Sequence, residues 1–475
     1  MFFLLLHSTF CLLTLQAQNV GIGTSTPEAK LHIKGSTDIS QLIIDGNPIQ
    51  TNIQPLIRLR NGAGADLLHI HADTEFNVFI GINAGRVNDA PGGGLFNTLI
   101  GSNSGYFNTT GARNTSLGRA ALYQNTSGSY NTALGFKTLF SNIGGTDNTA
   151  IGHEALLGNI SGAINTAVGA STLKNNIAGI ANTALGVSAM TLNTTAGNNT
   201  AIGVEALALQ SYNNGGVSWS SYNTAIGAEA LFYNQPTSTG NGIQNTAVGY
   251  QSLNKNTTGA NNTAVGYNSL INLVGGSNNI ALGQFAGTNL STPHINNTIS
   301  IGNAGYLNAA SNQAFFGDLN TVWNGGNMTW STYSDGRIKN NITEDVKGLE
   351  FITRLRPVTY YRSIKAMTEI TENKEVSNYP GKYDVEKIKF TGFIAQDVEQ
   401  AAKASGYNFS GITIPKNSRE LYTLSYEQFV VPLVKAVQEQ QKEIEALKSQ
   451  NSNVNRQNAQ LEVRLQKMEA LLLKQ

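Results

Sequence analysis

The chain has 475 residues, of which 31 are basic and 30 acidic, so its formal net charge is +1 and no nucleic acid or strongly acidic partner is expected. Only 13% of the residues are charged, about half the usual share of globular proteins, while 50 glycines indicate a chain rich in turns. The single cysteine, Cys11, lies in the N-terminal apolar stretch, and removal of that stretch would exclude disulfides, cysteine-ligated zinc and thiol catalysis.

The first segment, Phe2 to Leu15, is largely apolar and is followed by a small residue, Ala17. This pattern is typical of a secretory signal peptide, so residues 1–17 are predicted to be cleaved off. No Lys or Arg precedes the apolar run, which leaves an uncleaved anchor as the alternative. The run is shorter than the about 20 residues of a membrane-spanning helix, and no later apolar run reaches about 18 residues. We therefore expect a secreted or cell-surface protein with no membrane span in the mature chain.

Residues 18–75 are predicted to form an N-terminal β region. The segment Asn19–Gly35 resembles the mature N-terminus of many secreted bacterial repeat proteins, with a Gly-rich turn, a Pro stop and then a strand at Leu31–Ile33. Its glycines do not form a phosphate loop, because no Lys-Ser/Thr follows them. Further on, His69 and His71 stand at i and i+2, so on a strand they point the same way. We interpret this pair as incidental rather than as a metal site, and predict no metal and no cofactor.

Residues 76–305 are predicted to form a repeat array. Its unit reads Asn-Thr-Ala-apolar-Gly, and the glycines recur every 17 residues at Gly101, Gly118, Gly135, Gly152, Gly169, Gly186 and Gly203. After two insertions the phase resumes at Gly227, Gly249, Gly266 and Gly283. One such rung cannot bury its apolar face alone, whereas stacked rungs can, so the array indicates a parallel β-roll or β-solenoid. A globular all-β domain with many turns is the alternative.

Two further positions of the unit carry structural meaning. An apolar residue stands four positions after nine of these eleven glycines: Leu122, Leu139, Leu156, Leu173, Met190, Leu207, Leu231, Leu253 and Leu270. An Asn stands at the entrance of each strand (Asn114, Asn131, Asn148, Asn165 and Asn182), where a turn with left-handed backbone or a ladder of stacked side chains would suit it.

The array resembles the head repeats of trimeric bacterial adhesins, which form a parallel β-roll, although the 17-residue period is longer. Only nine charged residues lie between Asn97 and Gly305, so a lone solenoid would be poorly protected and three chains around an axis would hide its apolar edges. The insertions at Leu209–Ser221 and Gln235–Gln244 are expected to project and to be the first places to look for a surface or glycan ligand.

Residues 306–333 are predicted to be a loop-like linker that holds Trp323 and Trp330. Charges return from Asp335 onward, and the segment 334–425 begins with Ser-Asp-Gly-Arg-Ile-Lys. It resembles the S74 peptidase family, the intramolecular chaperone domain of phage endosialidases and tail spikes. Three later blocks carry the same resemblance, at Leu355–Tyr361, at Thr391–Glu399, and from Leu424 to Glu439.

The resemblance implies self-cleavage at the bond Tyr333–Ser334, with Ser334 as nucleophile and Lys339 as its base, coupled to assembly of a homotrimer. A serine hydroxyl needs such a base, and a lysine serves as one only when burial lowers its pKa from about 10.4. From the bare motif, the alternative is that Ser334 caps a helix and Lys339 is solvated. Arg337 could contact the oxyanion, but a salt bridge with Asp335 is the preferred interpretation.

Residues 426–475 are predicted to form a trimeric coiled coil. Apolar residues dominate the a positions (Val430, Val437, Ile444, Asn451, Asn458, Leu465 and Leu472) and the d positions (Leu433, Gln440, Leu447, Val454, Leu461 and Met468). Ser425 to Gln428 could serve as a capping box, and Pro432 fits the first turns of a helix. The alternative is an amphipathic helix packed on its own domain.

We thus expect a mostly β protein with a trimeric solenoid stalk, a small α+β chaperone domain and a coiled coil. The leading hypothesis is a bacterial fibre or adhesin-like protein whose C-terminal domain assists trimerisation and cuts itself off once. The main alternative is a purely structural adhesin with an uncleaved trimerisation domain. A tail fibre with glycan hydrolase activity is a third possibility, but the charge-poor array shows no paired carboxylates.

Overall fold

The computed structural model describes residues 20–22, 29, 31–33, 42–45, 54–287, 294–302, 310–318, 321, 332–371, 383–418 and 420–473. The predicted signal peptide, Cys11, Trp323 and Trp330 lie outside these residues. The chain divides into two compact units, residues 1–164 and 165–475, and each is described by itself.

The first unit opens with β1 (Val20–Ile22) and β2 (Leu31–Ile33), which pair in parallel and confirm the strand expected at Leu31–Ile33. Next come β3 (Ile57–Arg60), β4 (Asp66–His71) and β5 (Val78–Ile80), joined as antiparallel neighbours. From β5 onward every pairing is parallel and in register, through β6 (Thr98–Ile100), β7 (Thr115–Leu117), β8 (Thr132–Leu134) and β9 (Thr149–Ile151).

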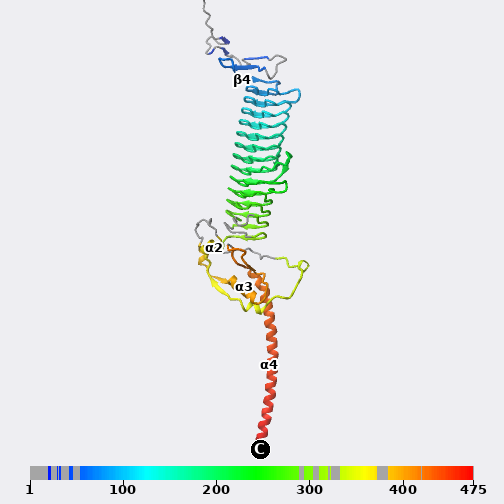
Figure 1. Cartoon of the computed structure of the whole chain (residues 1–475), viewed down its shortest axis with the longest axis vertical. Coiled ribbons are helices and arrows are strands. Elements are labelled where there is room, and N and C mark those ends of the chain that lie inside the picture. Colours follow the sequence, from blue (N-terminus) through cyan, green and yellow to red (C-terminus); the bar gives the residue numbers. More distant parts are fainter. Residues whose placement is uncertain are drawn as a thin grey trace, which may run out of the picture. The chain divides into compact units, whose positions relative to one another are not determined.

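The second unit continues the same architecture. Its parallel stack consists of β10 (Thr166–Val168), β11 (Thr183–Leu185), β13 (Thr200–Ile202), β15 (Thr224–Ile226), β16 (Thr246–Val248), β17 (Thr263–Val265), β18 (Ile280–Leu282), β19 (Ile299–Ile301) and β20 (Ala314–Phe316). Figure 1 shows these rungs following one another in chain order. Strand β20 falls in the stretch that was expected to be a loop-like linker.

The interior of each rung is filled by two kinds of side chain. In most of the strands the central residue is an Ala that points inward, and Ala150, for example, is completely buried. Opposite it lies the apolar residue four positions after the glycine, and all nine of the predicted residues, Leu122 to Leu270, are at most 1% exposed. Because the flanking Thr and Ile, Val or Leu of the strand face outward, alternation places the small residue inside and the β-branched ones outside.

The repeated glycines are required by both backbone geometry and stacking. Gly169 has φ +135°, a conformation that L-residues rarely adopt, and a Cβ there would lie 2.5 Å from the carbonyl oxygen of Gly186 in the next rung. Gly186 stands in the same relation to Gly203. The 17-residue glycine period therefore records the point at which successive backbones approach most closely.

The Asn residues form ladders between rungs, which confirms the expectation of stacked, hydrogen-bonded Asn side chains. The backbone N–H of Asn131 donates to Oδ1 of Asn114 over 3.0 Å, and its side-chain amide donates to the carbonyl of Gly145. The left-handed backbone falls instead on the residue before each Asn, with φ 56° at Arg113 and 60° at Tyr130. The expectation of left-handed backbone at the Asn itself was therefore wrong. The Asn side chain makes the hydrogen bonds of the ladder, and the residue before it adopts the turn conformation.

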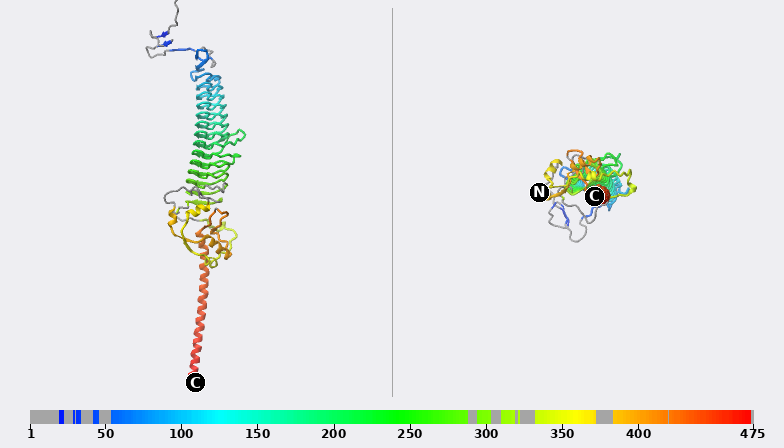
Figure 2. Two further views of the ribbon diagram at one scale, coloured as in Figure 1. Left: turned by 60° about the vertical axis from the view of Figure 1, so that its left-hand side comes forward. Right: turned by 90° about the horizontal axis from the view of Figure 1, so that it is seen from below.

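The first insertion both packs and projects. Its strand β14 (Trp219–Ser220) pairs in parallel with β12 (Ala196–Gly197), and Trp219 is only 8% exposed. Val217 of this insertion is 64% exposed, and a green segment projects from the stack in Figures 1 and 2. A second set of Asn side chains also forms a ladder between rungs, and Gln210 takes the place of one Asn in it. The side-chain oxygen of Gln210 accepts a hydrogen bond from the side chain of Asn234 over 2.9 Å.

The C-terminal part of the second unit is a small α/β region followed by a long helix. Its elements are η1 (Gly336–Ile338), α1 (Leu349–Ile352), β21 (Val358–Tyr360), α2 (Ile364–Thr371), η2 (Asp384–Lys387), β22 (Phe390–Gly392), α3 (Ala395–Ala404), β23 (Ile412–Thr413), β24 (Thr423–Leu424), η3 (Tyr426–Phe429) and α4 (Val430–Leu472). The expected fold class is confirmed: a mostly β chain with a parallel β-solenoid, a small α/β region and a long C-terminal helix.

Candidate functional site

The two residues singled out at the start of the C-terminal region are in contact. Lys339 Nζ donates a hydrogen bond to Ser334 Oγ over 2.7 Å. The two residues flank the single turn of η1, and the backbone on either side, at Asp335 and Lys339, is extended. The turn therefore reverses the chain enough for side chains five positions apart to meet.

Asp335, and not Ser334, caps this turn. Its carboxylate accepts the backbone N–H of Arg337 over 2.9 Å and pairs with the Arg337 guanidinium, whose Nη2 lies 2.5 Å from Oδ2. The preferred salt-bridge interpretation of Arg337 is thus confirmed. The same guanidinium, followed by the same backbone N–H, holds the pKa of the Asp335 carboxyl below its usual range.

The site is open to solvent in the single chain. Tyr333 is 98% exposed, and each residue from Ser334 to Asp345 is exposed as well. Among the described residues, therefore, none covers the Tyr333–Ser334 bond or the side-chain nitrogen of Lys339, and both are open to solvent.

The residue blocks that suggested a family lie together around one core. Phe351 of α1 is completely buried and packs with Val398 of α3, Phe409 and Phe429. Strands β21 and β22 bring the first two blocks together as an antiparallel pair, with Thr359 opposite Thr391.

Polar contacts join the same blocks. Arg356 pairs with Asp397 over 2.6 Å, and the Tyr422 hydroxyl donates to Glu399 over 3.0 Å. The Tyr426 hydroxyl accepts the backbone N–H of Phe393 over 3.0 Å, which ties the last block to the second. These contacts hold the segment that follows the Ser334–Lys339 pair as one domain.

The first turns of α4 present two faces. Pro432 and Ala436 are buried against the domain, one and two turns after the buried Phe429 of η3. The heptad stripe faces elsewhere and is exposed, with Val437 at 61% and Leu447 at 63%. The expected capping box is absent, because no side chain caps η3 at Ser425, whereas Pro432 lies in the first turn of α4 as expected.

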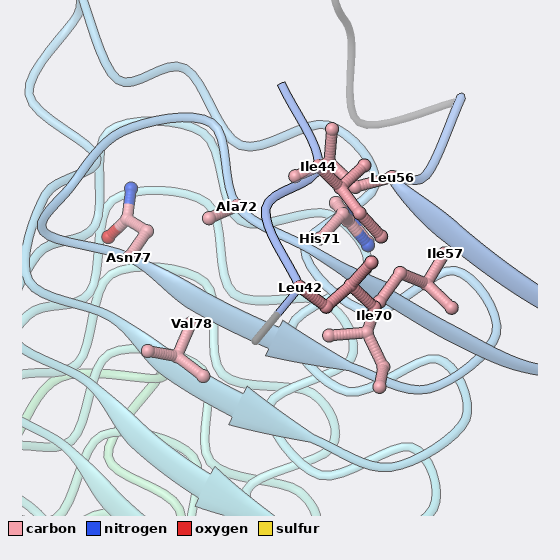
Figure 3. Close-up of a pocket in the computed structure, with 9 residues that line it drawn as sticks. All are labelled: Leu42, Ile44, Leu56, Ile57, Ile70, His71, Ala72, Asn77 and Val78. Carbon is pink, nitrogen blue, oxygen red and sulfur yellow. The ribbon is translucent and has the colours of Figure 1, made fainter. Parts of the chain in front are cut away.

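His69 and His71 lie on β4 and share one face, as predicted from their spacing. Both are buried, and Nε2 of His69 lies 3.3 Å from Asp66 Oδ2. Burial lowers the pKa of His71 below its usual value, and neither of its ring nitrogens has a hydrogen-bond partner in the described structure. His71 borders a mostly apolar pocket of about 390 Å³ that also includes Leu42, Ile44 and Leu56 (Figure 3).

Comparison with known proteins finds a family match over one part of the chain. Residues 334–407 match the model of the peptidase S74 family, described as the chaperone of endosialidase. No curated protein and no solved structure matches the chain. The match begins at Ser334 and supports the resemblance to this self-cleaving peptidase family seen in the sequence.

No helix among the described residues is long and apolar enough to cross a membrane.

Proposed function

We propose that this chain is a secreted or cell-surface trimeric fibre whose C-terminal domain assists trimerisation and then releases itself by cutting the Tyr333–Ser334 bond. The observation that carries the proposal is the 2.7 Å contact between Lys339 Nζ and Ser334 Oγ, at the first residue of a domain from a self-cleaving family. The solenoid would be the lasting product, and the enzyme would act once, on itself.

The positions of the groups suggest how the cut proceeds. Ser334 supplies the nitrogen of the scissile amide, so its Oγ can attack the Tyr333 carbonyl carbon through a five-membered ring. As the O–C bond forms, the hydroxyl proton passes to the neutral Lys339 amine. The C–N bond then breaks as the lysine returns the proton to the leaving nitrogen, which yields an ester. Water hydrolyses this ester to give the Tyr333 carboxylate, the Ser334 hydroxyl and a free Ser334 amine.

Assembly would switch on this chemistry. An exposed lysine is an ammonium ion, which can donate to Oγ but cannot accept its proton. A lysine becomes a base when a low-dielectric environment disfavours the charged form. Because the described residues of one chain leave Lys339 exposed, the desolvating groups would come from other copies of the chain.

Two exposed apolar surfaces support a trimer. Along α4, ten heptad positions are at least 44% exposed: Val430, Leu433, Val437, Ile444, Leu447, Val454, Leu461, Leu465, Met468 and Leu472. Along the solenoid, the outward apolar residues of the strands form a second row, in which Leu134 is 40% and Ile202 37% exposed. Removal of such surface from water contributes about 25 cal/mol per Å² to the free energy, which opposes the entropy lost when chains associate. The row on the strands would face partner chains.

The test is the mass of the secreted chain in four forms, which are the wild type, the variants Ser334→Ala and Lys339→Gln, and one control. We expect the wild type to yield the products 18–333 and 334–475, and both variants to remain joined while keeping the wild-type oligomeric state. Lys339→Arg is the matched control, because it keeps the charge and length but cannot act as a base at neutral pH. Cleavage of Ser334→Ala at the wild-type rate would refute the assignment.

A purely structural fibre with an attached trimerisation domain is the second candidate. It is favoured by the full exposure of the Ser334–Lys339 pair in the single chain. A secreted wild-type trimer that stays intact at Tyr333–Ser334 would decide for this candidate. In either case the exposed tip of the first insertion, around Val217, is the proposed place for a surface or glycan ligand.

A further inference from the structure

The contact between Ser334 and Lys339 depends on the turn between them. Five residues of fully extended chain span about 17 Å, far beyond the reach of a hydrogen bond between a serine and a lysine. The residues Asp335 and Lys339 are themselves extended, so η1 alone provides the reversal. Whatever stabilises η1 therefore sets the fraction of time in which the two side chains meet.

The turn has little support from its own backbone or from packing. Two long backbone hydrogen bonds close it, from Ile338 N–H to the Asp335 carbonyl and from Lys339 N–H to the Gly336 carbonyl, both 3.2 Å. None of its residues is buried. An isolated 3₁₀ turn of three residues is poorly stable, because many dihedral angles are fixed for few hydrogen bonds.

Gly336 makes the turn weaker still. Glycine loses more backbone entropy than any other residue when its conformation is fixed. At Gly336 that freedom is not required, because φ is not positive and a Cβ would meet nothing within 4 Å. An alanine would fit and would favour the turn.

Asp335 supplies the stabilising hydrogen bonds that the backbone of the turn lacks. Its carboxylate accepts the Arg337 backbone N–H at 2.9 Å, and the Arg337 Nε lies 2.9 Å from Oδ2 and 3.1 Å from Oδ1. Among the described residues, Arg337 supplies the hydrogen bonds to this carboxylate, which is therefore aimed along the turn and away from the reacting atoms. The paired guanidinium holds the pKa of this carboxyl below its usual range.

We propose that Asp335, held by Arg337, is a positioning residue of the self-cleavage site, which fixes the turn that brings Lys339 Nζ to Ser334 Oγ. This inference rests on the proposed self-cleavage. It assigns Asp335 no part in proton transfer, and it makes Gly336 the weak point that the clamp offsets.

The experiment follows cleavage of the full chain over time and pH in four forms: wild type, Asp335→Ala, Asp335→Asn and the double variant Asp335→Ala/Gly336→Ala. We expect Asp335→Ala to cut at least about tenfold more slowly with an unchanged pH profile. Asp335→Asn keeps an oxygen for the Arg337 N–H and should stay much closer to the wild type. Adding Gly336→Ala should restore about two- to fivefold, because alanine favours the turn independently of Asp335.

Three outcomes would overturn the inference: wild-type speed in Asp335→Ala, a displaced pH profile, or no rescue by Gly336→Ala. The last two would instead make Asp335 a participant in the chemistry. Trimer content is measured for each variant, and a slow variant that has lost its trimer is judged by the second readout alone.

That second readout does not need cleavage. In the uncuttable Ser334→Ala chain, amide hydrogen exchange at Arg337 and Lys339 should accelerate in Asp335→Ala and much less in Asp335→Asn. Unchanged exchange would refute the clamp even if the chain cuts. A wild type that fails to cut would refute the proposed function, while exchange would still decide whether Asp335 holds the turn.

Discussion

The backbone N–H of Leu349 donates to Oε2 of Glu439 over 2.7 Å, although 90 positions separate the two residues. Leu349 begins α1, whose N-terminus has no side-chain cap of its own, and Glu439 reaches it from the face of α4 that packs against the domain, next to Ala436. Gly348 allows this approach, because a Cβ there would lie 2.7 Å from the backbone nitrogen of Ala436. The start of the chaperone domain is thus joined to the helix that carries the heptads.

Removal of this carboxylate should loosen the domain. In Glu439→Ala, the half-buried N–H of Leu349 loses its acceptor, which costs about 1–3 kcal/mol. Glu439→Gln retains an acceptor oxygen and is the matched control. Denaturant unfolding of the Ser334→Ala chain, with hydrogen exchange across α1, measures the difference. Equal stability of the Ala and Gln variants would show that the hydrogen bond contributes nothing.

Substitution of a ladder glycine should damage the solenoid. Gly169→Ala would force an L-residue into φ +135° and place its Cβ 2.5 Å from the Gly186 oxygen, so we expect a loss of at least about 2 kcal/mol. Gly240→Ala is the control, because that glycine has no positive φ and only Ser238 Oγ, at 3.8 Å, near the added atom. Thermal unfolding of both variants distinguishes them, and similar midpoints would contradict the stacking argument.

Much of this architecture could be predicted from the sequence, because each rung of a stacked fold requires the same residue types at the same positions. The glycine period, the buried Leu139 and its equivalents, and the Ser334–Lys339 spacing could all be read from residue order. The left-handed backbone of Leu139, φ 51°, could not, because bulky residues avoid that region and only the stacked rungs around it enforce it.

Individual polar contacts could not be predicted from the sequence either. Nothing in residue order indicates that Glu439 caps α1, that Asp335 rather than Ser334 caps η1, or that Gln210 enters a ladder of asparagines. In each case a polar group finds its partner only after packing has set the distance. The second Asn ladder, in which Asn125 donates to Asn108 over 2.6 Å, carried a detectable signal. Its residues recur seven positions after the glycines.

The exposed stripe of α4 predicts an effect on assembly. Val437→Ser together with Ile444→Ser removes two apolar a positions that are 61% and 45% exposed in the single chain. We expect loss of the trimer in analytical ultracentrifugation and, with it, loss of self-cleavage. Lys442→Ser, on the opposite face of the helix, is the control and should change neither. A double variant that remains trimeric would exclude α4 as the main trimer contact.

His71 should make the start of the solenoid sensitive to acid. Burial, followed by the nearby His69, lowers its folded pKa, while Asp73 opposes the shift. Below the unfolded pKa of about 6.5, His71 binds a proton in the unfolded chain but stays neutral in the folded chain. The free energy of unfolding therefore decreases as pH falls, until pH reaches the folded pKa. Above pH 6.5 this group has no effect. The protection of β4 and β5 against hydrogen exchange, measured relative to the intrinsic exchange rate at each pH, should therefore decrease as pH falls from about 6.5 to about 5. His71→Phe, which preserves an aromatic ring 5.2 Å from Phe79, should remove this response, whereas substitution of the exposed His153 by Gln should not. An identical acid response in the wild type and His71→Phe would assign it to other groups.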